Sequence, residues 1–281
     1  MAIPIIKIEN PRGQVLDFST DSRYLPILTG TGPPPATVNR SKSSTTDGAQ
    51  FNSATVDERP LLLTVHLIKD VARARLNLYK YIATKQYIKV YYQNDGLSVY
   101  VEGYIETVEV DPWAENQAVQ VSIICPMPFW RDVQETITDA SNVRPLFEMP
   151  FFTDDQGVEL SAKETNASTI LENRGTVEAG ATFVLTATRR SLQPRLYNLT
   201  TGEYMGFYVD LFPGEQLEVC TVTGSKRVTH IADGVRSNYI NTLMEGSAWL
   251  QMPIGENEFI YTVDEGECTL VVKHTNMYTG V

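Results

Sequence analysis

Short runs in which apolar and polar residues alternate recur along the whole chain, and such alternation predicts β-strands with one buried face. In the first part, turn signals separate these runs at residues 10–13 (Asn-Pro-Arg-Gly) and 93–96 (Gln-Asn-Asp-Gly). Residues 59–68 are instead almost continuously apolar, which predicts a strand buried on both faces. The predicted strands of the first part cover residues 4–8, 14–18, 59–68, 87–92, 97–103, 104–110 and 117–125.

One segment has helical instead of alternating spacing. Asp70 is a candidate N-cap, and the residues after it place an apolar stripe opposite a basic one. This pattern predicts a helix over residues 70–84 that packs through its apolar stripe. The stripe consists of Val71, Leu76, Tyr79 and Ile82, and the basic residues are Arg73, Arg75 and Lys80.

Residues 29–49 have no hydrophobic period. They begin with Gly-Thr-Gly-Pro-Pro-Pro at 30–35 and continue with a stretch rich in Ser, Thr, Asn and Lys. This composition predicts a long loop, and long loops in compact domains are usually functional or ordered by a partner. We therefore expect the segment to pack on a neighbouring subunit.

A change in charge near residue 130 predicts a domain boundary. Up to residue 130 the chain has 12 Lys and Arg against 13 Asp and Glu, whereas beyond it the numbers are 11 and 21. Pro126 and Pro128 also end the last strand of the first part, because proline cannot donate to a central ladder. A chain of 281 residues is long enough for two domains, which we place at 1–130 and 131–281.

The second part contains many short strand-like runs separated by turns. It opens with a polar, acidic segment over residues 131–166, which predicts a linker and an edge strand. Because no long helical pattern follows, the spacing predicts an antiparallel β-sandwich or jelly roll, and the whole chain is expected to be mostly β with a minor α component. The runs cover residues 181–188, 195–199, 204–211, 216–222, 227–231, 247–252, 257–263 and 269–274.

No catalytic signature is present. The Gly-Thr-Gly of residues 30–32 precedes prolines instead of a helix, so it does not predict a phosphate-binding loop. The acidic residues 154–159 lack the alternating ligands of a calcium loop, which favours a surface turn. Asp264, Glu265 and Glu267 could pair as acid and base, but their place in a tight turn favours a solvated tip. We therefore expect neither enzymatic activity nor a cofactor.

Cysteine, histidine and net charge narrow the classes of partner. The cysteines are few, odd in number and far apart in apolar runs, so we expect buried thiols, and the histidines lack the close pairing of a zinc site. The net charge of −11 argues against specific nucleic-acid binding. No run approaches the ~18 apolar residues of a membrane span, and we expect synthesis in the cytoplasm. The residues are Cys125, Cys220, Cys268, His66, His230 and His274.

Aromatic residues are frequent in the second part, which leaves a carbohydrate-binding function open. Sugar-binding β-sandwiches stack sugar rings on exposed aromatic side chains. Trp249 lies in an apolar run between Ala248 and Leu250, which favours a core position for it. The aromatic set is Tyr197, Tyr204, Phe207, Tyr208, Tyr239, Trp249, Phe259 and Tyr261.

Several segments together resemble siphophage distal tail proteins. The segments of the first part are 48–51 (Gly-Ala-Gln-Phe), 58–63 (Glu-Arg-Pro-Leu-Leu-Leu) and 125–130 (Cys-Pro-Met-Pro-Phe-Trp), with a helix and a hairpin between the last two. Those of the second part are 197–204 (Tyr-Asn-Leu-Thr-Thr-Gly-Glu-Tyr), 248–252 (Ala-Trp-Leu-Gln-Met) and 255–261 (Gly-Glu-Asn-Glu-Phe-Ile-Tyr). They extend over most of the chain, and none is catalytic.

The resemblance implies a structural protein of the virion tail tip. Its first domain would be a split β-barrel with a flanking helix that forms a homohexameric ring or a dimer of rings, and its second a galectin-like sandwich that projects outward. The implied partners are the tail tube protein, a tail-tip or tail-associated lysin protein, and a receptor-binding or fibre protein. Some relatives return the end of the chain to the first domain, and residues 278–281 are too few to decide this here.

The subunit interface is expected in residues 40–51 and in the predicted helix 70–84. The individual candidates are Arg40, Lys42, Phe51, Arg73, Arg75 and Tyr79. A hub predicts self-association, whereas a carbohydrate-binding module for host-surface adhesion predicts a monomer that binds glycans. An esterase-like or glycosidase enzyme predicts turnover, which the missing motifs argue against.

Overall fold

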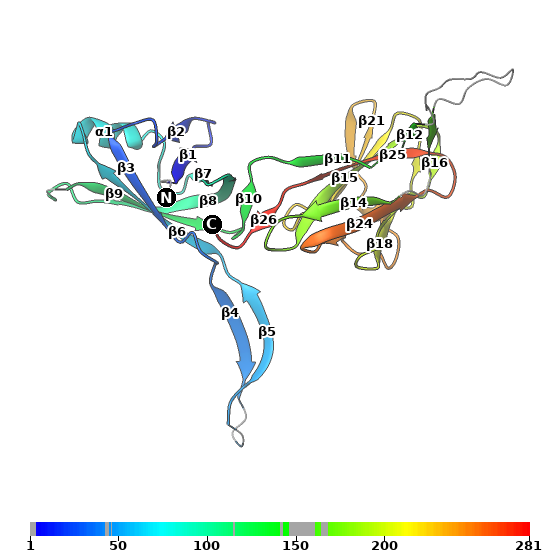
Figure 1. Cartoon of the computed structure of the whole chain (residues 1–281), viewed down its shortest axis with the longest axis horizontal. Coiled ribbons are helices and arrows are strands. Elements are labelled where there is room, and N and C mark those ends of the chain that lie inside the picture. Colours follow the sequence, from blue (N-terminus) through cyan, green and yellow to red (C-terminus); the bar gives the residue numbers. More distant parts are fainter. Residues whose placement is uncertain are drawn as a thin grey trace. The chain divides into compact units, whose positions relative to one another are not determined.

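The computed structural model describes residues 4–42, 45, 47–114, 116–140, 143–145, 161–163 and 168–281 (Figure 1). The chain forms two compact units, the first comprising Met1–Val133 and Met277–Val281 and the second Gln134–Asn276. The division after Val133 lies close to the step in charge. Residues 277–281 return to the first unit, which the sequence left undecided.

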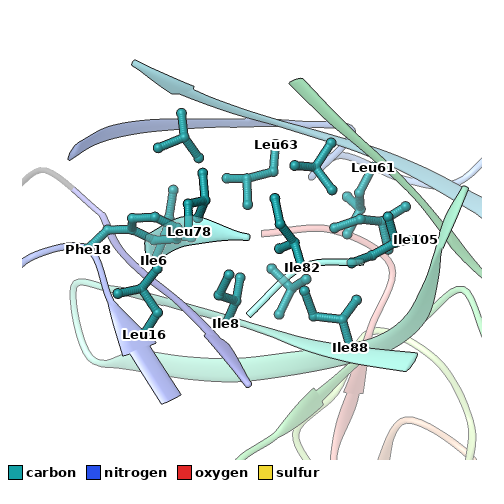
Figure 2. Packing of buried hydrophobic residues seen from close by; sticks show 14 of the residues in the cluster. Ile6, Ile8, Leu16, Phe18, Leu61, Leu63, Leu78, Ile82, Ile88 and Ile105 are labelled. Atoms are coloured by element: carbon teal, nitrogen blue, oxygen red, sulfur yellow. The ribbon is translucent and has the colours of Figure 1, made fainter. Parts of the chain in front are cut away.

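The first unit is built on an antiparallel sheet with strand order β2-β1-β7-β8-β9-β6-β3, and β10 pairs with both β8 and β26. Figure 2 shows Ile6 and Ile8 of β1 across the core from Leu61 and Leu63 of β6. Strands from distant parts of the sheet therefore enclose one core. The bounds are β1 Ile5–Glu9, β2 Val15–Asp17, β3 Tyr24–Thr29, β6 Arg59–Leu67, β7 Tyr87–Asn94, β8 Leu97–Val110, β9 Ala118–Cys125, β10 Trp130–Asp132 and β26 Met277–Tyr278.

Burial alternates along β1, β6 and β9 of this sheet. In β6, Leu61 and Leu63 are buried whereas Leu62 is exposed, so the prediction of a strand buried on both faces was wrong. The apolar residues on the second face made the sequence look continuous. The predicted strands 97–103 and 104–110 are one strand, β8, whose register shifts between Ile105 and Thr107. As predicted, β9 ends before the prolines, at Cys125.

Helix α1 (Val71–Leu78) is shorter than predicted, and only part of the predicted stripe packs: Val71 and Ile82 pack in or against the core, whereas Leu76 and Tyr79 are exposed. Ala74 and Leu78 are its buried residues, while Leu76 is 66% exposed. Asp70 is the N-cap residue, as predicted, but it adopts a left-handed conformation with φ 49° and its side chain makes no cap hydrogen bond. The small Ala74 allows a close approach to the core, a possibility that the search for large apolar residues missed.

The predicted long loop over residues 29–49 contains one strand of a hairpin, β4. β4 (Ala36–Ser41) pairs with β5 (Gln50–Val56), and together they form an arm that extends from the body of the first unit (Figure 1). Every side chain of both strands is exposed. Without a buried face the arm has no hydrophobic alternation, so the pattern that identifies the other strands was missing here.

The second unit is a sandwich of two antiparallel sheets, as predicted. One has the order β11-β25-β15-β20-β21-β22 and the other β14-β24-β17-β18. Phe183 of β15 and Phe259 of β24 contact each other at 5.3 Å between ring centroids, so the two sheets share one core. The bounds are β11 Thr136–Asp139, β14 Thr169–Asn173, β15 Ala179–Ala187, β17 Arg195–Asn198, β18 Glu203–Gly206, β20 Gln216–Cys220, β21 Arg227–Ala232, β22 Val235–Asn238, β24 Gly255–Thr262 and β25 Cys268–His274.

Several short elements complete the second unit. β16 pairs with β19, β12 pairs with β13, and β23 pairs with β15. The predicted run 204–211 is therefore two strands, β18 and β19, which pair with different partners. The bounds are β12 Val143–Pro145, β13 Ser161–Lys163, β16 Ser191–Leu192, β19 Asp210–Leu211, β23 Gln251–Met252 and the 3-10 helix η1 Ile240–Thr242.

Candidate assembly surface

Two of the three carboxylates considered for catalysis, Asp264 and Glu267, are held in ion pairs. Asp264 contacts Arg195 at 2.5 Å (Oδ1 to Nη1), and Glu267 lies 3.8 Å from Arg189 (Oε2 to Nε). The turn at residues 264–267 is therefore not simply solvated, because Asp264 and Glu267 form ion pairs with arginines. The acidic residues 154–159 lie outside the described residues.

The cysteines are free and buried, as predicted. Burial raises the pKa of the Cys125 thiol to about 12, and nearby Arg59 offsets only part of that rise. A thiol with this pKa is protonated at neutral pH and is a poor nucleophile. Among the described residues, no group of three His, Cys, Asp or Glu side chains could hold a metal ion. Within the same residues, no helix combines the length and apolarity needed to span a bilayer.

Trp249 does not offer an open platform for a sugar. It is half-buried, packs against the core of the second unit, and has the Lys226 ammonium 5.6 Å from its ring centroid. Tyr208 is a more exposed aromatic residue, whereas the exposed ring of Phe212 has the Arg190 guanidinium 5.7 Å from its centroid. The contacts of Trp249 and Phe212 argue against these two rings as sugar-binding platforms, whereas Tyr208 keeps a carbohydrate-binding function open.

The arm has two chemically different faces. In an antiparallel pair, directly paired residues lie on the same face. The register places Ala36 opposite Val56 and Val38 opposite Ala54, which makes one face of the arm apolar. The other face carries Thr37, Asn39, Ser53 and Thr55, where Asn39 donates a hydrogen bond to Ser53 at 3.0 Å. We call the first set the apolar face of the arm.

The predicted interface residues of the arm lie beyond this apolar face. The register shifts between Asn39 and Arg40, after which Arg40 pairs with Phe51. Phe51 is 65% exposed, and Lys42 is exposed just after β4 ends. The structure thus brings Arg40 and Phe51 together across the two strands, near an exposed basic residue.

The predicted interface residues of the helix form a separate group. Arg73 and Tyr79 are exposed, and Arg75 donates a 3.3 Å hydrogen bond to Gln117. Figure 1 shows α1 far from the free end of the arm, so the six predicted residues do not form one site within a chain.

A free sheet edge was not identified from the sequence. Among the strands that the structure describes, β3 pairs only with β6, and its side chains Leu25 and Ile27 are 51% and 47% exposed. A groove of about 460 Å³ lies along this edge, and β1 also lines it. Exposed apolar edge strands are association sites in many proteins. The lining residues are Pro4, Ile5, Ile6, Phe18, Ser19, Tyr24, Leu25, Pro26, Ile27, Leu28, Thr31 and Tyr92.

Ordered tyrosines occupy the face of β7 and β8 that points away from the core. Tyr87 donates to Glu102 at 2.7 Å and Tyr91 donates to Glu9 at 2.5 Å. Burial, together with these carboxylates, raises the pKa of both phenols. Tyr100 stands beside Tyr91 with ring centroids 5.9 Å apart. Aromatic side chains fixed in this way are typical of protein contact surfaces.

Arg59 is the most unusual residue that sequence reasoning missed. Its side chain is fully buried, and all its hydrogen bonds among the described residues go to main-chain carbonyl oxygens. The guanidinium also lies 5.5 Å from the ring centroid of Trp130. Burial lowers the pKa of Arg59 from its usual value. The available signal was the position of Arg59 in phase with the buried Leu61 and Leu63.

Comparison with known proteins gives similarity in fold. No family model matches the chain, and no curated protein matches it. The crystal structure of the SPP1 Dit protein, described as a paradigm of hub adsorption apparatus in phages that infect Gram-positive hosts, matches with a TM-score of 0.69 and 13% identity over 98% of this chain and 99% of that chain.

Two structures of the phage P2 baseplate in its activated conformation match less closely. The structure with Ca has a TM-score of 0.53 and 9% identity over 100% of both chains. The structure with Sr has a TM-score of 0.51 and 10% identity over 96% of this chain and 98% of that chain. Because the identities are only 9–13%, the similarity shows the fold alone.

Proposed function

We propose that this chain is a structural protein of the distal end of a bacteriophage tail. The observation that carries the proposal is a fold match over the full length of a hub protein, 98% of this chain and 99% of the SPP1 Dit protein. Such a match includes both units in the same order, which supports a common architecture. The protein would be a virion component of the tail tip, made in the host bacterial cytoplasm, without enzymatic activity.

In this proposal the first unit forms a homohexameric ring, alone or as a pair of rings. An isolated two-stranded hairpin is only marginally stable in water, so the arm gains most from a surface that covers its apolar face. The body of a neighbouring copy supplies such a surface. A contact between unlike surfaces of identical chains closes into a ring when the rotation between copies permits.

The six predicted interface residues fit this arrangement as two halves of one contact. Arg40, Lys42 and Phe51 belong to the arm, and Arg73, Arg75 and Tyr79 belong to or adjoin the helix. Because the two groups are far apart in one chain, a ring contact would use one group from each of two copies or each group against a different neighbour.

The remaining partners follow from the hub role. The ring would join the tail tube protein to a tail-tip or tail-associated lysin protein, and the second unit would hold a receptor-binding or fibre protein. Beyond residue 130 the chain carries 21 Asp and Glu against 11 Lys and Arg, which keeps this part soluble and favours partners with basic surfaces.

Oligomeric state tests the proposal. We expect the purified full chain to form six-membered rings in electron micrographs, and its mass in light scattering to rise with concentration. Val38→Asp places a charge on the apolar face of the arm and is expected to abolish the rings. Thr55→Asp places the same charge on the opposite face of the same arm and serves as the matched control. A chain that stays monomeric at every concentration, also with tail proteins added, would contradict the proposal.

The second candidate function is a carbohydrate-binding module in the second unit. The exposed Tyr208 favours it, because a solvent-facing ring can stack on a sugar. This candidate predicts that the monomeric chain is retained on a glycan array and that Tyr208→Ala removes the retention. Ring formation without glycan retention would leave the hub as the function.

A further inference from the structure

A buried arginine connects the base of the arm to residues 277–281. We propose that Arg59 and residues 277–281 form a brace that holds the base of the arm in the position from which it meets a neighbouring copy. The brace is a property of the single chain. Only its purpose in assembly rests on the proposed function.

The first half of the brace is the contact between Arg59 and the segment that leads into β4. The Nη1 of Arg59 donates to the carbonyl oxygens of Gly30 at 2.7 Å and Gly32 at 2.5 Å. Gly30 has φ +84°, and a side chain there would come within 2.3 Å of the Pro60 carbonyl oxygen. The backbone at the base of the arm is therefore fixed both by hydrogen bonds and by close packing.

The second half is the contact of residues 277–281 with the same guanidinium and the same segment. The Nη2 of Arg59 donates to the carbonyl oxygen of Thr279 at 2.6 Å. The amide of Val281 donates to the carbonyl oxygen of Thr31 at 3.1 Å. A side chain at Gly280 would meet the backbone of Gly32 at 3.0 Å, so glycine permits this approach.

Two further contacts anchor the brace to the sheet. The Nε of Arg59 donates to the Pro128 carbonyl oxygen at 2.6 Å, in the link between β9 and β10. β26 pairs with β10, with Tyr278 opposite Trp130 and Met277 opposite Arg131. Residues 279–281 are thus held in place by a strand pair on one side and by the arginine on the other.

Desolvation makes the contacts of Arg59 depend on one another. A buried charge is costly unless its surroundings compensate it, and here the compensation among the described residues comes from main-chain carbonyl groups and the Trp130 ring. Loss of the Thr279 carbonyl would leave one face of the guanidinium without a partner and weaken its hold on Gly30 and Gly32. Docking of residues 277–281 and the geometry of the arm base are therefore coupled.

Hydrogen exchange in the full-length protein tests this coupling. A variant that lacks residues 279–281 keeps β26 but loses the Thr279 and Val281 contacts. We expect the amides of residues 29–38, other than the prolines at 33–35, to exchange at least about tenfold faster, with the β7–β8 amides unchanged. Val281→Thr keeps the shape of the residue and its main-chain amide, and it serves as the matched control with unchanged exchange.

A second variant tests the arginine itself and guards against misfolding. Arg59→Met removes the buried charge along with its hydrogen bonds, and replacements of buried ionic groups by apolar ones are often tolerated. We expect it to raise exchange in the same residues 29–38. If either variant leaves exchange at residues 29–38 unchanged, or raises it equally in β7–β8, then the arginine and residues 277–281 only support the core and the proposal is wrong.

The exchange readout separates this inference from the proposed hub. Exchange is measured at a concentration at which the wild-type chain is monomeric, so ring formation does not affect it. A wild type that light scattering shows to be monomeric at every concentration, also with tail proteins added, together with a loosened arm base in the truncated variant, would keep the brace and reject the hub. If the wild type forms rings but neither variant changes hydrogen exchange at the base of the arm, the hub proposal stands and the brace is rejected.

Discussion

Two hairpins of the first unit, β7–β8 and β4–β5, are both antiparallel ladders, yet their side chains differ in burial. In β7–β8, burial alternates, and the inward residues Ile88, Val90, Val99 and Val101 belong to the core. In β4–β5, all side chains are exposed. The comparison shows that hydrophobic alternation reports which face of a strand is buried and does not report the strand itself.

The same difference separates what stabilises the two hairpins. Burial of an aliphatic side chain contributes about 1.5–3 kcal/mol, and β7–β8 has several. The arm has cross-strand pairs such as Asn39 with Ser53, worth roughly 0.2–1 kcal/mol each. A hairpin that depends on such small terms reaches full order most easily against a second surface, which fits a role in assembly.

The largest expected effect contrasts truncations in the two hairpins. Ile88→Ala removes a fully buried side chain and is expected to lower the free energy of unfolding of the isolated chain by about 2–5 kcal/mol. Phe51→Ala removes a larger but exposed side chain and is expected to change it by less than about 0.5 kcal/mol. Urea unfolding of both variants below the concentration of self-association measures the difference. Equal losses would show that the arm contributes to the stability of the single chain.

A smaller effect is expected from glycines with different surroundings. A side chain at Gly103 in β8 would meet Cys125, Ile123 and Ile124 at 2.8 Å, whereas one at Gly32 beside the arm would meet nothing within 4 Å. Gly103→Ala is therefore expected to destabilise by about 1–3 kcal/mol, and Gly32→Ala to be nearly neutral. Thermal melting of the two variants provides the comparison. A neutral Gly103→Ala would indicate that β8 and β9 can move apart without cost.

The sequence predicted most elements whose residues have one buried face. The hairpin β7–β8, the end of β9 and the central strands of the sandwich follow from alternation and turn residues. Three features could not be predicted in this way, each for a physical reason: the strands of the arm, the residues through which the helix packs, and the role of Arg59. The arm has no buried face, the helix packs through Ala74 rather than larger residues, and the role of Arg59 depends on carbonyl groups remote in sequence.

The six predicted interface residues show the same limit. Composition marked residues 29–49 as exceptional, and Arg40, Lys42 and Phe51 do lie on an exposed arm. The helix candidates were chosen from a periodic pattern that assigned Leu76 to the wrong face. The edge of β3 gave no signal, because whether a strand lies at an edge depends on the order of strands in the sheet.

The smallest expected effect concerns a partly exposed ion pair, Asp21 with Arg23, just before β3. Asp21 accepts hydrogen bonds from the Arg23 side chain, which lower the pKa of the carboxyl below its usual 3.8. A lowered pKa in the folded chain stabilises it above the pKa of the unfolded chain, and the contribution disappears as pH falls through the folded value. Asp21→Asn is expected to lower stability by less than about 1 kcal/mol at neutral pH.

Urea unfolding at two pH values checks this last expectation. The difference between wild type and Asp21→Asn should be measurable near pH 7 and should shrink as the pH falls through the lowered pKa of the folded chain. A difference that persists in acid would show that the side chain acts through packing or local backbone geometry instead of charge.

The pairing of β26 with β10 has a consequence for how the chain is made. Residues 277–281 leave the ribosome after the whole of the second unit, yet they belong to the first. Protein domains generally fold as units in the order of synthesis. Here the earlier unit can gain strand β26 only after the later unit has been translated. Because Val281 belongs to the first unit, a fusion tag attached to it would lie next to the first unit instead of the second.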